Sequence, residues 1–189
     1  MSIEIVREHL KKWDAQDRIL EFPVSSATVE LAAEAVGCEP ARIAKTLSFL
    51  VPDTDETKGQ TKDRLKEQSG QPAAEGAGFH AVLIVAAGDA KVDNSKYKHY
   101  FHTKAKMLKG EQVTELIGYA IGGVCPFGVK EGTQICLDVS LKRFETVFPA
   151  AGSANSAIEV TMEELERFSG SCEWVDLCKG WQTVDADAS

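Results

Sequence analysis

Apolar residues recur at helical spacing in several short stretches of the chain. Within residues 2–16, Val6, Leu10 and Trp13 fall on one face of a helix. Other stretches have the same period, and none exceeds about four turns. The expected helices cover roughly residues 2–16, 26–37, 41–45, 94–101, 111–119 and 162–168.

Capping residues mark the ends of several of these helices. Ser25 or Ser26 is expected to cap the second helix, which ends near Gly37, where a left-handed residue belongs. Asp93 can cap a basic helix, and Thr161 opens a capping box. These signals fix helix starts better than periodicity alone.

Continuous apolar runs predict buried strands. Residues 80–87 are apolar on both faces and most simply pair as a hairpin with residues 46–51. Strands outnumber helices without a regular strand–helix alternation, which favours a mixed or antiparallel sheet in an α/β (mixed α+β) domain. The expected strands are residues 19–24, 46–51, 80–87, 134–139, 146–148, 156–161 and 173–177.

A polar segment interrupts this pattern at about residues 52–79, where Leu65 is almost the only large apolar residue. A long connection without a core-forming pattern is typical of an inserted surface loop. We therefore expect one domain over residues 1–183 that carries this loop. Residues 184–189 are expected to form a flexible acidic tail.

Charge is unevenly distributed along the chain. The formal net charge is −8, but between Gly88 and Gly110 six lysines stand against two aspartates, which gives that stretch +4. A polyanionic partner therefore remains compatible with the acidic total. Lys91, Lys96, Lys98 and Lys104 are candidates to contact such a partner, although a solvated lysine-rich helix is an equally good interpretation.

Other classes of protein are disfavoured. No apolar run reaches the roughly 20 residues that cross a bilayer and no secretory signal is visible, so we expect a cytoplasmic protein without membrane contact. Five cysteines without a C-x-x-C pair argue against a disulfide framework and a zinc site. His99 and His102 lack a third ligand at a suitable spacing, so neither metal nor cofactor is expected.

Lys45 is the first candidate for chemistry. It is flanked by Ile43, Ala44 and Leu47 at an expected helix–strand junction, which would bury its stem and direct its ammonium towards a phosphate or hydroxyl-rich ligand. A surface lysine that extends into solvent is the simpler alternative.

The second candidate is a loop of three glycines and one proline at residues 122–128. Gly122 and Gly123 allow backbone amides to approach a ligand without Cβ obstruction, as in an oxyanion hole, although a tight apolar turn is equally compatible. Cys125 in this loop could be a nucleophile, but no histidine has a familiar spacing to it. A packed thiol is the better interpretation.

Three segments carry a resemblance to a known family. Residues 36–47, residues 83–89 and above all residues 121–128 resemble the YbaK family of aminoacyl-tRNA deacylases, which is similar to the editing domain of bacterial prolyl-tRNA synthetases. The resemblance runs from the first helix to about Gly170, with residues 52–79 as a departure. It implies a strongly curved mixed β-sheet or partial barrel surrounded by helices, with a single cleft.

The resemblance also implies an activity and its residues. The expected enzyme is a trans-editing hydrolase that removes a wrongly attached amino acid from the 3′ end of tRNA. Its expected partners are mischarged aminoacyl-tRNA and an aminoacyl-tRNA synthetase. Lys45 matches the lysine that contacts the terminal nucleotide, and Gly122 and Pro126 match the ends of the family's G-x-x-x-P loop. The expected catalytic set is Lys45, Gly122, Gly123, Cys125 and Pro126. With tRNA as the implied polyanion, Lys91, Lys96, Lys98 and Lys104 are the expected tRNA-binding residues.

Two departures from the family pattern leave alternatives open. Ala150 and Ala157 occupy positions where bacterial members carry serine and aspartate, so the polar role passes to neighbouring residues or is lost. A non-catalytic module that binds aminoacyl-tRNA or a synthetase-like partner is the main alternative, and a cysteine hydrolase is a third. The expected substrate-binding residues are Ser26, Thr28, Thr46, Gly152, Ser153 and Asn155.

Overall fold

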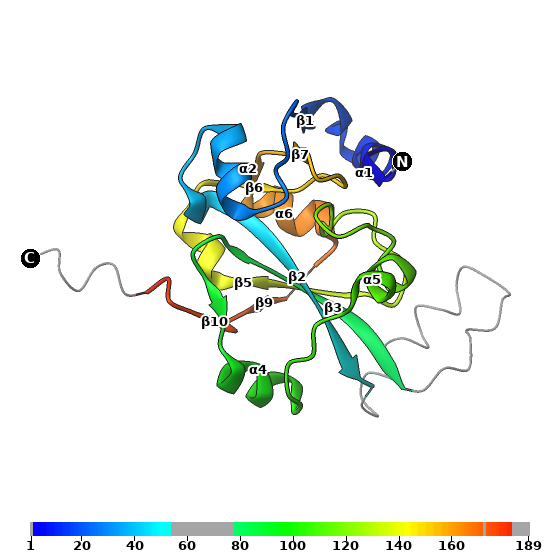
Figure 1. Cartoon of the computed structure of the whole chain (residues 1–189), viewed down its shortest axis with the longest axis vertical. Helices are drawn as coiled ribbons and strands as arrows, with labels where there is room; N and C mark the ends of the chain where they lie inside the picture. Colours follow the sequence, from blue (N-terminus) through cyan, green and yellow to red (C-terminus); the bar gives the residue numbers. More distant parts are fainter. Residues whose placement is uncertain (1, 54–77, 172, 183–189) are drawn as a thin grey trace, which may run out of the picture.

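A six-stranded sheet forms the centre of the structure, a computed structural model that describes residues 2–53, 78–171 and 173–182. The described strands are β1 (Leu20–Glu21), β2 (Ile43–Pro52), β3 (Phe79–Ala87), β4 (Lys91–Val92), β5 (Gln134–Asp138), β6 (Thr146–Pro149), β7 (Ser156–Ala157), β8 (Val160–Thr161), β9 (Trp174–Val175) and β10 (Cys178–Lys179). In the sheet they follow the order β8-β6-β2-β3-β5-β9, and β1 pairs with β7 and β4 with β10 outside it (Figure 1).

The sheet is mixed and strongly curved. β2 pairs antiparallel with β3, and β6 with β8, whereas β2–β6, β3–β5 and β5–β9 are parallel. The strands curl into a half-barrel surrounded by helices, which confirms the predicted mixed α+β fold. The described α-helices are α1 (Ser2–Leu10), α2 (Val29–Val36), α4 (Asn94–Phe101), α5 (Gly110–Leu116) and α6 (Met162–Ser169), with 3-10 helices η1 (Lys11–Trp13), η2 (Gln16–Arg18), η3 (Pro40–Arg42) and η4 (Val139–Arg143).

The β2–β3 hairpin confirms the pairing predicted from the two apolar runs. Its register extends from Ala44 opposite Ala87 to Pro52 opposite Phe79. Pro52 and Phe79 are therefore strand residues, and the predicted loop boundary at 52–79 is one residue too wide at each end. Residues 54–77 of that loop lie outside the described residues, as does the predicted tail.

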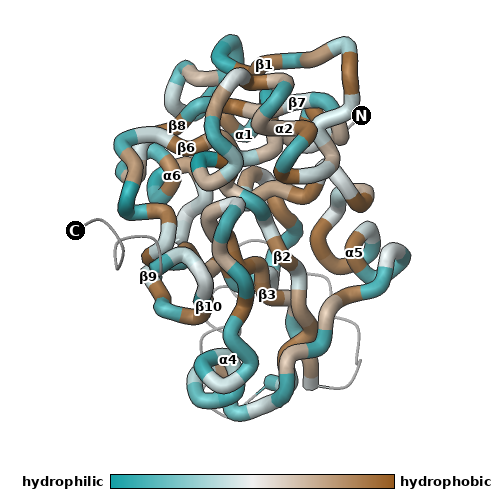
Figure 2. The backbone as a smooth tube through the Cα atoms, turned by 60° about the vertical axis from the view of Figure 1, so that its left-hand side comes forward, coloured by the Kyte–Doolittle hydropathy of each residue, from teal (hydrophilic) through white to brown (hydrophobic). Residues whose placement is uncertain are grey.

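β3 is buried on both faces, as its continuous apolar sequence predicts. Leu83 and Val85 belong to the larger core, while Val82 and Ile84 pack in a second core with Tyr97 of α4. The alternation follows from the two-residue period of a strand. Figure 2 shows the hydrophobic β3 within the fold and the largely hydrophilic α4 outside it.

Several predicted element ends are wrong for local reasons. The α-helical part of the first helix ends at Leu10, and the 3-10 turn η1 extends it to Trp13. It goes no farther because Asp14 takes a left-handed conformation with φ 57°. The predicted helix at 41–45 is only the 3-10 turn η3, since Ile43 already pairs with Phe148 in the sheet. The predicted strand 156–161 is split, because β7 pairs with β1 and β8 with β6.

The predicted caps have mixed outcomes. Thr28, not Ser25 or Ser26, caps α2, and its Oγ1 accepts from the amide of Leu31. The caps at Gly37, Asp93 and Thr161 are confirmed, the first with φ 82°.

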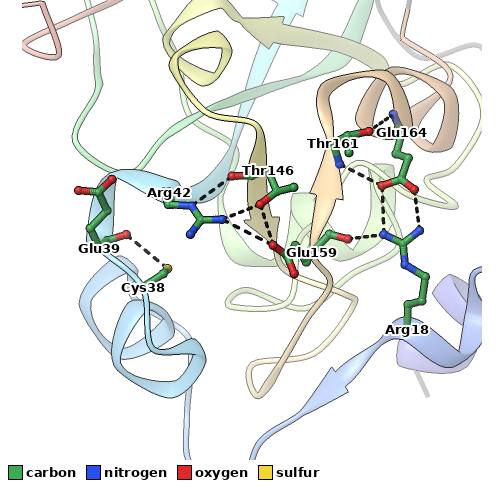
Figure 3. Close-up of polar contacts among 8 residues, drawn as sticks. All are labelled: Arg18, Cys38, Glu39, Arg42, Thr146, Glu159, Thr161 and Glu164. Carbon is green, nitrogen blue, oxygen red and sulfur yellow. Dashed lines mark hydrogen bonds and ion pairs between the residues drawn. The ribbon is translucent and has the colours of Figure 1, made fainter.

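Two arginines tie β6 and β8 to their neighbours (Figure 3). Arg42 donates to the carbonyl oxygen and the Oγ1 of Thr146 at 3.3 and 2.5 Å. Arg18 forms a bidentate pair with Glu164 at 2.7 and 3.0 Å and also donates to the carbonyl oxygen of Glu159. Bidentate arginine contacts fix geometry as well as charge. Arg42 thereby anchors β6, which forms one wall of the cavity described below.

Within the described part of the chain, no helix is both long and apolar enough to span a membrane.

Candidate functional site

A cavity of about 380 Å³ opens along one edge of β2. Its walls come from α2 and the residues before it, from β6 and β7, from the segment that enters α5, and from the glycine loop after α5. Most lining residues are apolar, and Lys45 is the one charged residue among those that the structure describes there. The lining comprises Ser26, Ala27, Thr28, Val29, Ala32, Ile43, Ala44, Lys45, Thr46, Leu47, Ser48, Met107, Leu108, Val113, Ile121, Gly122, Val124, Phe148, Ala150, Ser156 and Ala157.

The cavity exists because β2 changes its neighbour. β6 pairs with β2 only as far as Ala44, which lies opposite Pro149. Farther along, the carbonyl oxygen of Ser48 accepts from the amide of Leu108 at 3.1 Å. Between these two pairings the outer edge of β2 has no partner strand among the described residues. Thr46 lies at the centre of that gap.

Thr46 has three polar groups at this gap, namely its backbone amide, its backbone carbonyl and its side-chain hydroxyl. Alternate residues of an antiparallel strand direct their backbone groups to the same side, so Thr46, like Ser48, directs its amide and carbonyl away from β3. Its Oγ1 is buried and has no hydrogen-bond partner among the described residues. A buried hydroxyl without a partner costs stability. Because Thr46 lines the cavity, we treat this hydroxyl as a candidate ligand-binding group.

Lys45 lies in β2 beside Thr46 and is partly buried. Its Nζ donates to the carbonyl oxygen of Gly88 at 3.3 Å and also to that of Ala90. Burial lowers the pKa of this ammonium from its ordinary value. Two carbonyl oxygens occupy two of the three ammonium donors, which leaves one donor without a hydrogen-bond partner among the described residues.

The turn that holds Lys45 depends on Gly88. A Cβ on Gly88 would lie 2.0 Å from the carbonyl oxygen of Pro40. The amide of Gly88 donates to the carbonyl oxygen of Ala41 at 3.3 Å. Only glycine permits this approach of the β3 end to η3. The close packing brings the carbonyl groups after β3 within reach of the lysine.

The glycine loop lies across the cavity from β2. Gly122 lines the cavity in a left-handed conformation with φ 92°. Gly123 does not line the cavity. The amide of Gly123 donates to the carbonyl oxygen of Ala120 at 3.1 Å, and its Cα packs against Gly152. Pro126 also lies outside the lining. Of the loop residues 122–128, Gly122 and Val124 border the cavity. Val124 lies within the predicted loop but was not named as a site residue.

Cys125 is fully buried behind this loop and does not line the cavity. Its thiol donates to the carbonyl oxygen of Phe127 at 3.8 Å, and the hydroxyl of Tyr119 donates to the same oxygen. Burial raises the pKa of the Cys125 thiol to about 12. A neutral thiol in this position agrees with a packing role rather than a nucleophilic one.

Ala150 and Ala157 face each other across a β-bridge and both line the cavity. They contribute only methyl groups to it. Ser156 lies beside them, but its Oγ is already bonded to the Ser153 hydroxyl at 2.7 Å. This wall of the cavity is therefore mainly apolar.

The predicted substrate-binding residues divide into two groups. Ser26, Thr28 and Thr46 line the cavity, and the Oγ of Ser26 donates to Ala154 at 3.3 Å. The other three lie outside the lining and stabilise the loop behind it. These are Gly152, against which Gly123 packs, Ser153, which bonds Ser156, and Asn155, which donates to Phe22 at 3.0 Å.

The four predicted tRNA-binding lysines do not form one cluster. Lys98 and Lys104 border a second hollow at α4, whereas Lys91 lies in β4 opposite Lys179. Lys96 pairs with Asp176 at 2.7 Å. Among the described residues no group of three or more His, Cys, Asp and Glu side chains is arranged to hold a metal ion.

Sequence reasoning missed the apolar rim of the cavity. Met107 and Ile121 are 57% and 70% exposed although both are large and apolar. Exposed apolar side chains around a concavity are typical of a ligand site. The one sequence feature that indicates this rim is the position of Ile121 next to the glycine loop.

The sequence matches one protein family and one bacterial protein over most of its length. Residues 24–168 match the family described as aminoacyl-tRNA editing domain. The "Uncharacterized protein YwhH" of Bacillus subtilis (strain 168) is 47% identical over 182 residues, which cover 96% of this chain and 100% of that protein.

Solved structures agree with the fold. A candidate trans-editing enzyme for prolyl-tRNA synthetase has a TM-score of 0.72 and 26% identity, with coverage of 95% of this chain and 98% of that chain. The hypothetical protein APE2540 has a TM-score of 0.66 and 20% identity, with coverage of 90% and 99%. At that identity the second likeness supports the fold alone.

Proposed function

Because the chain belongs to the aminoacyl-tRNA editing-domain family, we propose that it is a free-standing deacylase that hydrolyses the ester between a wrongly attached amino acid and the tRNA 3′ end. The observation that carries the proposal is the unpaired edge of β2 inside the cavity. There Lys45 and Thr46 offer unused hydrogen-bonding groups beside an apolar pocket.

Each group has a proposed role. The remaining N–H donor of Lys45 binds the terminal adenosine. The backbone groups and the hydroxyl of Thr46 bind the aminoacyl group. Backbone amides of Gly122 and Val124 polarise the ester carbonyl. One or two preorganised donors, each worth about 2.7–4 kcal/mol, account for much of the barrier lowering that an activated ester needs.

The proposed reaction needs no side-chain nucleophile. Water attacks the carbonyl carbon, the bond to the ribose oxygen breaks, and that oxygen takes a proton to leave free tRNA and amino acid. The described cavity lining contains no Cys, His, Asp or Glu. A hydroxyl of the substrate itself, rather than a protein base, is therefore proposed to assist the water.

A non-catalytic module is the second candidate, and Ala150 and Ala157 favour it. Both contribute only methyl groups to the cavity, where a catalytic wall would offer polar ones. This module would retain aminoacyl-tRNA in the cavity and leave its ester intact.

One experiment separates the two candidates. The purified protein is incubated with mischarged tRNA carrying a labelled amino acid, and both retained complex and released amino acid are measured. The deacylase predicts release well above the spontaneous rate. Retention of intact aminoacyl-tRNA without release would support the binding module.

A further inference from the structure

Four lysines on and after α4 form an exposed basic path, defined here as Lys98, Lys104, Lys106 and Lys109. All four are exposed, and none forms an ion pair with another described residue. Elsewhere, by contrast, Lys96 is paired with Asp176. Unpaired cations on a chain with net charge −8 are free for a polyanionic ligand.

The path reaches the mouth of the cavity. The segment between α4 and α5 runs beside β2, where the amide of Leu50 donates to the carbonyl oxygen of Lys106 at 2.8 Å. Met107 and Leu108, which line the cavity, therefore lie between Lys106 and Lys109. Figure 1 shows this connection running from α4 to α5.

The other end of the path is a hollow of about 440 Å³. Its described lining is Asn94, Ser95, Lys98, Lys104 and Ala105 and includes no carboxylate. Ammonium, amide and hydroxyl groups around one hollow are suited to phosphate oxygens. The path thus connects a hollow lined by groups suited to phosphate to the mouth of the cavity along β2.

We propose that Lys98, Lys104, Lys106 and Lys109 bind the phosphate backbone of the tRNA acceptor end and direct its 3′ terminus into the cavity. The inference rests on the proposed function for the identity of the RNA. Because lysines contact phosphates and not base edges here, binding along the path is independent of tRNA sequence.

The test compares two double variants that remove the same charge. Lys106→Gln with Lys109→Gln alters the path, and Lys12→Gln with Lys142→Gln alters exposed lysines outside both hollows. The dissociation constant for a mixed total tRNA fraction is measured over a series of salt concentrations. Melting temperatures verify folding, since exposed substitutions change stability by only about 0.5 kcal/mol.

The path variant is expected to bind tRNA at least tenfold more weakly than wild type at about 0.1 M salt. Its slope of log affinity against log salt is expected to fall by about one for each lysine removed. The control variant should keep the wild-type slope. Equal slopes in wild type and path variant would overturn the proposal.

A second readout keeps this inference separate from the proposed function. Hydrolysis of a 3′-aminoacyl-adenosine, which has no phosphate backbone, should be the same in the path variant and in wild type within about twofold. Hydrolysis of mischarged tRNA should fall in the path variant alone. If wild type hydrolyses neither substrate, the proposed function fails, whereas the salt slopes still decide whether the path binds tRNA.

Discussion

The Nζ of Lys45 donates to the carbonyl oxygen of Gly88 across 3.3 Å, which holds the ammonium at the edge of the cavity. Lys45→Met keeps the apolar stem and removes the charge. We expect deacylation of mischarged tRNA to fall at least tenfold in kcat/KM, about 1.4 kcal/mol of transition-state stabilisation. Unfolding free energy should change by no more than about 1–2 kcal/mol. Wild-type kcat/KM in a folded Lys45→Met protein would remove Lys45 from the mechanism.

Thr46 offers a test in which stability and activity change in opposite directions. Thr46→Val replaces a buried hydroxyl that has no described partner with a methyl group, so unfolding free energy should stay equal or rise by about 1 kcal/mol. Activity should fall at least fivefold, and Thr46→Ser should retain most of it. Denaturant unfolding and kcat/KM measure the two effects. Equal activity of the valine and serine variants would exclude a role for the hydroxyl.

Cys125 should be dispensable for chemistry. Its thiol pKa of about 12 keeps it neutral at pH 7–9, so iodoacetamide should not modify it in the folded protein. Cys125→Ala is expected to retain at least a third of wild-type kcat/KM. Mass spectrometry of alkylated peptides provides the measurement, with the partly exposed Cys38 as the internal control. An inactive but folded Cys125→Ala protein would instead indicate a cysteine hydrolase.

The contact between Gly123 and Gly152 should be sensitive to a single methyl group. A Cβ at position 123 would lie 2.7 Å from the carbonyl oxygen of Gly152. Gly123→Ala is therefore expected to lower the unfolding free energy by about 1–3 kcal/mol. Gly110→Ala is the control, since its added Cβ would meet only the flexible end of Ile121 at 3.2 Å. Similar melting temperatures for both variants would contradict this packing.

The parts of the fold that depend on local sequence could be predicted. The apolar run of β3 specifies a buried strand, and its hairpin with β2 follows from adjacency in sequence. The caps at Asp93 and Thr161 were readable because each side chain bonds amides two or three residues away. Capping depends on neighbours in the chain, which the sequence lists directly.

The open edge at Thr46 could not be predicted, because distant segments create it. β6 leaves β2 after Ala44, and Leu108 joins it at Ser48, so the gap depends on chain some 60 to 100 residues away. The same applies to Gly123, whose loop position suggested a ligand contact although its neighbour is Gly152. Glycine tolerates either use, and only tertiary packing decides between them.

The most direct test of the account is amino-acid release from a panel of mischarged tRNAs by wild type and by Ala27→Phe. Ala27 is exposed at the cavity mouth close to Gly122, so phenylalanine there should block entry without unfolding the chain. Wild type is expected to release the amino acid from at least one member of the panel, and Ala27→Phe at less than a tenth of that rate. No release by wild type from any member, or equal release by both proteins, would contradict the claim that this cavity hydrolyses aminoacyl-tRNA.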